Sequence, residues 1–155
     1  MAKVILENFP MKSGVSDMAR DKFEVLGPAY EQIGLELAQI VGGDPDGVYL
    51  YAEAGEGWYG YGIFKDEGNQ VRYYDPNSEL SELIYAAWLI EDPDKRWAVM
   101  EYVIEGTKFD ARFQFPEELD PNESEMERRP RALKRKFGDK PIIYPPLLAR
   151  FQDSE

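Results

Sequence analysis

The chain of 155 residues contains no cysteine and no histidine. Without cysteine it forms no disulfide and offers no thiolate to a metal ion or a substrate. Without histidine it lacks the commonest general base and the commonest zinc ligand. P-loop and G-x-S-x-G motifs are absent as well. An enzyme built on this chain would depend on carboxylates, lysine, tyrosine or serine alone. We therefore expect a protein that binds another protein rather than an enzyme, with no cofactor and no metal site.

Long apolar runs are missing too. Near the N-terminus the only such run is Val4-Ile5-Leu6, which is shorter than the apolar stretch of a signal peptide. No window elsewhere approaches the length of a transmembrane helix. These absences predict a soluble, cytoplasmic protein that does not enter a membrane. The length and the 43% of apolar residues favour one folded domain over residues 1–155.

Positive charge is scarce over most of the chain, whose formal net charge is −12. Residues 1–122 hold 24 acidic and 10 basic side chains, whereas residues 123–140 hold 4 acidic and 7 basic ones. An acidic body repels phosphate, so we expect no nucleic acid ligand. It attracts a basic protein partner instead, although net charge alone also serves solubility. The basic run of residues 128–136 lacks interleaved aromatic residues, and we expect it to pair with the acidic body of the same chain.

Hydrophobic periodicity predicts an α+β fold in the order α-β-β-β-α-β-β-α. Apolar residues three and four apart predict a helix over residues 17–41, broken at Gly27-Pro28 so that Pro28 opens its main part. The same spacing predicts a second helix capped by Ser78, and a third that Asn122 caps, Pro130 kinks or restarts, and Gly138 closes. Alternation predicts five strands, at residues 47–53, 58–65, 70–75, 96–105 and 108–115.

Short links between these strands favour an antiparallel sheet of about five strands, with the helices packed on one face. Residues 1–16 and 141–155 show no such pattern, and we expect them to be extended or loop-like arms. The edges of an open sheet can pair between copies, so the sequence leaves a monomer and a homodimer both open.

An aromatic run at residues 58–62 is the most suggestive feature for binding. Tyrosine and tryptophan are enriched at protein interfaces, because they bury much area with little loss of entropy. Glycines between them allow another backbone to approach. Packing within the sheet is the alternative reading of this run. Together with nearby acidic residues, it predicts a partner-binding set of Glu53, Glu56, Trp58, Tyr59 and Tyr61.

Three stretches of the chain resemble the YezG-like immunity proteins of bacterial polymorphic toxin systems. Residues 29–52 resemble the opening helix and first strand of that family, and Gly106-Thr107-Lys108-Phe109 with Phe113-Gln114-Phe115 resembles its hairpin. Residues 127–138 resemble its C-terminal signature, with Pro130 as a departure. Residues 1–27 and the Gly-Gly-Asp-Pro-Asp-Gly stretch before the first strand also depart from the pattern.

This resemblance implies a cytoplasmic, stoichiometric inhibitor, or antitoxin, that binds a cognate toxin domain and has no catalytic residues of its own. Toxins of these systems are often nucleases, whose phosphate-binding surfaces are basic, so an acidic inhibitor complements them. Two other hypotheses remain open. One is an adaptor or regulatory domain for a non-toxin protein, and the other is an enzyme in whose pocket several carboxylates converge.

Overall fold

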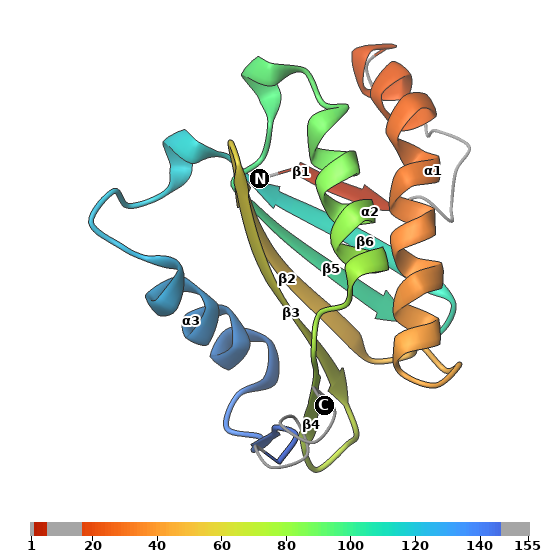
Figure 1. Cartoon of the computed structure of the whole chain (residues 1–155), viewed down its shortest axis with the longest axis vertical. Coiled ribbons are helices and arrows are strands. Elements are labelled where there is room, and N and C mark those ends of the chain that lie inside the picture. The colour runs from red at the N-terminus through yellow and green to blue at the C-terminus, as the bar shows by residue number, and fades with distance from the viewer. Residues whose placement is uncertain (1, 6–16, 147–155) are drawn as a thin grey trace.

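One mixed β-sheet of seven strands runs through the molecule, in the order β1-β6-β5-β2-β3-β4-β7 (Figure 1). It is seen in a computed structural model that describes residues 2–5 and 17–146. The fold class is α+β, as the sequence predicts, with three α-helices beside the sheet. The strands are β1 (Ala2–Ile5), β2 (Val48–Gly55), β3 (Trp58–Asp66), β4 (Val71–Tyr74), β5 (Val99–Glu105), β6 (Lys108–Gln114) and β7 (Ile142–Ile143).

The five predicted strands form the antiparallel centre of the sheet, which confirms that part of the prediction. Two hairpins have turns of only two residues, since Gly55 pairs with Trp58 and Glu105 pairs with Lys108. Gly57 and Gly106 occupy these turns with φ values of 77° and 65°, a conformation that glycine adopts without steric cost.

The two outer strands lie in the segments that the sequence predicts to be extended or loop-like arms. β1 pairs antiparallel with β6, and β7 pairs parallel with β4. With four and two residues, these strands are too short to show a clear alternation in the sequence, and their partners lie far away along the chain. The remainder of both predicted arms, residues 6–16 and 147–155, lies outside the described residues.

Helix boundaries differ from the prediction at the prolines and at one cap. α1 (Asp17–Ile40) continues through Pro28, and α3 (Glu125–Phe137) continues through Pro130. A proline removes one backbone hydrogen bond, and the bonds on either side hold these helices together. α2 (Ser78–Leu89) is capped by Asn77, not Ser78, while α3 is preceded by Ser124 and ends at Gly138 with φ of 66°.

Helices cover both faces of the sheet, so the prediction that they pack on one face is wrong (Figure 1). α1 and α2 bury one face, through residues such as Ile33 and Leu37 from α1 and Ile84 from α2. α3 covers the opposite face, where the sheet and helix side chains are Tyr49, Tyr51, Phe64, Val71, Val99, Ala132, Leu133 and Phe137. The alternate positions of β2 hold Tyr49, Tyr51 and Glu53, a pattern typical of a strand face that is exposed to solvent. In the structure all three residues are buried beneath α3.

Candidate interaction surface

The tip of the β2–β3 hairpin carries two half-exposed aromatic side chains. Trp58 is 50% exposed and Tyr59 is 44% exposed, and Glu56 is exposed in the turn between the strands. The Trp58 ring lies against Gly55, where an added Cβ atom would come within 2.3 Å of the indole Nε1. Glycine at position 55 therefore makes room for the ring. These three members of the predicted partner-binding set are placed where a partner can reach them.

A row of aromatic rings in contact with one another holds Tyr59 against α2. The Tyr59 and Tyr85 ring centroids are 5.4 Å apart, and Tyr85 stacks on Trp88 at 5.6 Å. The Arg96 guanidinium lies 4.6 Å from the Trp88 ring. The Tyr85 hydroxyl accepts a hydrogen bond from the backbone N–H of Gly57 at 3.2 Å. The hairpin tip is thus held in one orientation, which lowers the entropy cost of binding through it.

Tyr61 serves the fold, because only 5% of it is exposed. Its hydroxyl donates to the Asn77 carbonyl at 3.0 Å and lies 2.8 Å from the Ser81 Oγ, which ties β3 to the start of α2. Burial raises the pKa of this phenol. Tyr61 therefore belongs to the core rather than to a contact surface, which corrects its place in the predicted set.

Glu53 is likewise removed from the surface, with 1% of the residue exposed. Arg128 of α3 donates to both of its carboxylate oxygens, at 2.9 Å and 2.7 Å, and the Tyr51 hydroxyl donates to one of them at 2.6 Å. These hydrogen bonds with Glu53 raise the pKa of the Arg128 guanidinium. Glu53 holds α3 on the sheet, so its assignment to the partner-binding set is a second correction.

A similar arrangement two turns further along α3 is not evident from the sequence. Glu101 of β5 accepts a hydrogen bond from the Tyr49 hydroxyl at 2.5 Å and forms an ion pair with Arg135. Arg131 and Arg129 pair with Glu123 and Glu125. The basic run of residues 128–136 thus pairs with acidic groups of the same chain, as predicted. The signal that could have identified Glu101 is alternation along β5, which places it on the same face as Val99 and Val103.

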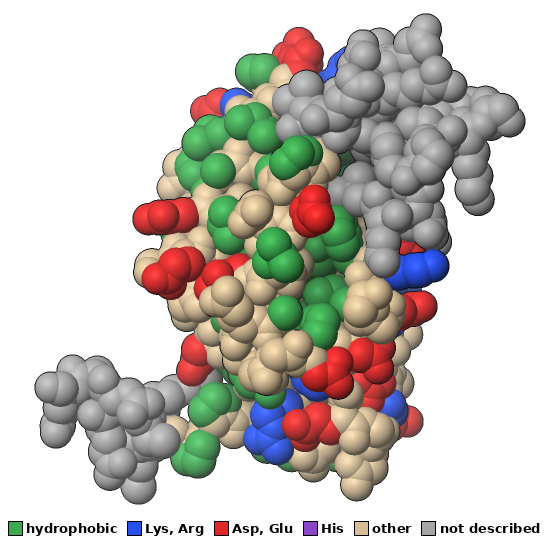
Figure 2. Space-filling model, turned by 90° about the vertical axis from the view of Figure 1, so that its right-hand side faces the viewer, with side chains coloured by type: hydrophobic (Ala, Val, Ile, Leu, Met, Phe, Trp, Pro, Cys, Tyr) green, Lys and Arg blue, Asp and Glu red, His purple; other side chains and the backbone are tan. Residues whose placement is uncertain are grey.

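The face formed by α1 and α2 stays acidic. α1 contains five acidic and two basic side chains, and α2 contains two acidic side chains and no basic one. Figure 2 shows the side of the molecule that carries α1, where hydrophobic and acidic side chains lie together and basic ones are sparse in the described part. Exposed apolar residues on these helices include Leu35, at 55% exposure, and Leu89, at 45%.

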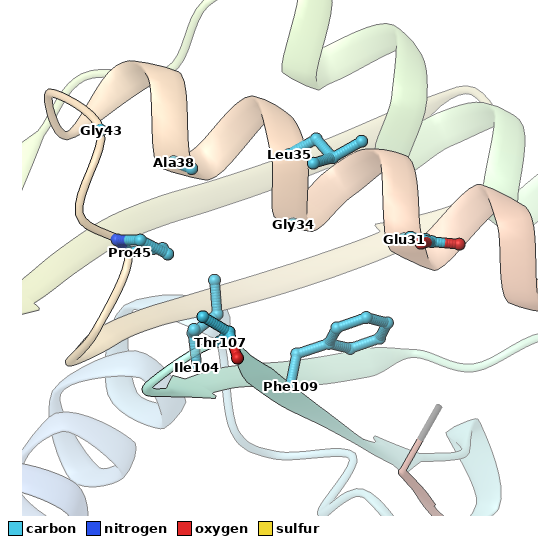
Figure 3. Close-up of a pocket in the computed structure, with 9 residues that line it drawn as sticks. All are labelled: Glu31, Gly34, Leu35, Ala38, Gly43, Pro45, Ile104, Thr107 and Phe109. Carbon is cyan, nitrogen blue, oxygen red and sulfur yellow. The ribbon is translucent and has the colours of Figure 1, made fainter. Parts of the chain in front are cut away.

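A pocket of about 540 Å³ opens between α1 and the β5–β6 hairpin (Figure 3). Leu35 and Gly34 of α1 lie on one side, and Thr107 and Phe109 of the hairpin lie on the other. Glu31 is the single carboxylate among the residues that line it. The lining is otherwise mainly apolar, so this pocket offers no converging set of acid and base groups.

The acidic residues that follow α2 have structural roles. Glu91 is 5% exposed, and the Asp92 side chain accepts from the backbone N–H of Asp94 at 3.2 Å, at the start of a short 3₁₀ helix. Among residues 2–5 and 17–146, no three carboxylates are grouped so that they could hold a metal ion. Within the same described residues, no helix has the length and apolar character needed to cross a bilayer.

Residues Gly55–Gly60 match the spacing G-x-G-x-x-G that occurs in dinucleotide-binding folds. That motif binds pyrophosphate only where it joins a strand to the N-terminus of a helix. Here it spans a hairpin turn between β2 and β3. The match therefore carries no nucleotide site.

Comparison with known proteins adds no relative. No protein-family model matches the chain, and no curated protein is significantly similar to it.

Proposed function

We propose that this protein is an immunity protein that binds a toxin domain through a basic surface of that domain and so neutralises it. The observation that carries the proposal is the separation of charge between the two faces. The arginines of α3 pair with glutamates of the same chain, whereas along α1 and α2 acidic side chains outnumber basic ones by seven to two. Such a face favours encounter with a basic protein.

The exposed aromatic tip of the β2–β3 hairpin supports contact beside this face, because Tyr59 packs on Tyr85 of α2. Trp58 and Tyr59 are large, fixed rings of the kind that dominate the energy of protein interfaces, and Glu56 and Glu82 are exposed acidic residues on the same hairpin and on α2. The family resemblance supports a toxin as the partner. The alternative is that the protein is an adaptor or regulatory domain, in which case a non-toxin protein would bind the same surface.

The proposal is tested by expressing the chain together with the toxin domain encoded beside it and measuring growth and binding. Wild-type protein should restore growth and form a complex of about one to one. The double variant Glu56→Lys with Glu82→Lys should bind about tenfold or more slowly, because it reverses two charges of the acidic face. A growth defect on deletion of the gene alone, without any toxin, would favour the adaptor.

A control with the same change in net charge separates local from general charge effects. Glu117→Lys with Asp139→Lys reverses two exposed carboxylates outside the α1–α2 face. Circular dichroism checks that both double variants fold. Equal losses in the two variants would contradict an acidic contact face, and failure of the wild-type protein to protect would contradict the proposed function.

A further inference from the structure

The strand β3 extends well beyond the strand that covers its outer edge. β3 has nine residues, but β4 pairs only with the four from Ile63 to Asp66. The chain leaves the sheet after Tyr74. If the same register continued, Asp75 would lie opposite Gly62 and Pro76 opposite Tyr61. Proline has no N–H to continue the ladder. In the described part of the chain, no strand pairs with the outer edge of residues 58–62.

The orientation of the backbone identifies which groups this edge presents. The N–H of Asp66 donates to the Gly47 carbonyl at 3.0 Å, so Asp66 faces β2. Backbone groups of successive residues in a strand alternate between its two neighbours. The N–H and C=O groups of Tyr59 and Tyr61 therefore point away from β2, along the open edge.

The face above this edge is open at one end and filled at the other. A Cβ atom added at Gly60 would meet no atom nearer than the Glu125 Oε1 at 4.0 Å, whereas one at Gly62 would lie 2.9 Å from the Phe64 ring and 3.1 Å from the Arg129 Nη1. Tyr59 is fixed by Tyr85, which keeps the backbone extended and ready to pair. Exposed edges of this kind accept extended segments of other proteins by main-chain hydrogen bonding.

We infer that the open edge of β3 at residues 58–62 binds an extended, basic segment of the partner as an added β-strand. The partner's identity as a toxin rests on the function proposed above. Charge favours this occupant, because Glu56, Asp75 and Glu79 are exposed acidic residues of the hairpin turn and of the segment that follows β4. Arg129, which lies against Gly62, is paired with Glu125. A second copy of the chain would bring the exposed acidic residues together, which disfavours pairing between copies.

Amide hydrogen exchange on the full chain tests the inference with a synthetic peptide of alternating lysine and valine, about six residues long. The amides of Tyr59 and Tyr61 should exchange quickly in the free protein. At a peptide concentration about ten times its Kd, they should exchange about tenfold more slowly. The amides of Gly60 and Gly62, which face β2, should change little. A peptide with glutamate in place of lysine should bind more weakly.

Three results would overturn the inference. They are slow exchange of Tyr59 and Tyr61 in the free chain, no slowing with the peptide, and slowing that depends on protein concentration alone, which would identify a second copy as the occupant. The variant Tyr59→Pro removes one outward N–H and should weaken peptide binding at least about fivefold. Tyr59→Ala removes the ring and keeps that N–H, so it shows how much of the loss comes from the side chain.

The same measurement with the toxin domain distinguishes the inference from the proposed function. Neutralisation without slowed exchange at Tyr59 and Tyr61 would overturn strand addition and leave the immunity function standing. Peptide binding at this edge without any neutralisation would contradict the immunity function and retain the edge as a binding site for basic strands.

Discussion

Arg128 of α3 and Glu53 of β2 lie 75 positions apart in the sequence and form a two-pronged ion pair beneath the helix. The remaining nitrogen of the guanidinium, Nη1, donates to the Glu123 carbonyl at 2.7 Å. Glu53 receives a third hydrogen bond from Tyr51. This cluster satisfies a buried carboxylate fully, and it places a charged helix on a face of the sheet.

Replacing Arg128 by alanine should lower the free energy of unfolding by about 3–5 kcal/mol, because Glu53 would stay buried without its counter-charge. Arg131→Ala is the matched control on the same helix. Its pair with Glu123 is formed by an arginine side chain that is 63% exposed, so the loss should stay below about 1 kcal/mol. Urea unfolding of both variants measures the difference. Similar values would mean that the Glu53 pair does not anchor α3.

The buried tyrosines predict a loss of stability in strong base. Burial raises the pKa of Tyr49, Tyr51 and Tyr102, and neighbouring carboxylates raise it further. The unfolded chain releases these protons near pH 10, whereas the folded chain keeps them. Their contribution is therefore fully present below about pH 10 and is lost as the pH rises above it. Each such phenol steepens the fall by up to about 1.4 kcal/mol per pH unit.

Tyr49→Phe should make this fall shallower by about the contribution of one proton. Unfolding curves at several pH values above 9, with phenolate absorbance as a second readout, provide the measurement. A slope that stays the same in the variant would show that Tyr49 ionises equally in the folded and unfolded chain.

Two variants at adjacent positions identify the residue that caps the N-terminus of α2. The Asn77 side chain accepts the Leu80 N–H at 2.8 Å, while Ser78 is exposed. Asn77→Ala should cost about 1 kcal/mol of stability. Ser78→Ala should cost much less, although the sequence suggests serine as the cap. Thermal or urea unfolding compares them, and a larger loss in the serine variant would contradict the observed cap.

Salt should slow association with a basic toxin domain. Opposite charges on separate molecules steer their encounter, and ions at about 0.15 M screen them beyond about 8 Å. Stopped-flow binding over a range of salt concentrations should give an association rate that falls steeply, with a smaller change in the dissociation rate. An association rate independent of salt would rule out charge as the driver of encounter.

Local patterns in the sequence are sufficient for the central elements of the fold. The alternation in residues 48–53 and 108–115, and the three- and four-residue spacing of apolar side chains in α2, mark those elements, because the geometry of strands and helices repeats over a few residues. The two glycine turns follow from the same local logic. The acidic body and the pairing of the basic run are readable from charge alone.

The tertiary structure alone decided which surfaces are buried and which are open. Glu53 and Tyr61 stand in the same stretch as Trp58 and Tyr59, yet α3 covers the first and α2 covers the second. The alternation of Tyr49, Tyr51 and Glu53 along β2 predicts side chains that face solvent. Only the folded chain shows that Arg128 pairs with the Glu53 carboxylate. The open edge of β3 also depends on where β4 ends relative to it, since pairing between strands is a relation between distant parts of the chain.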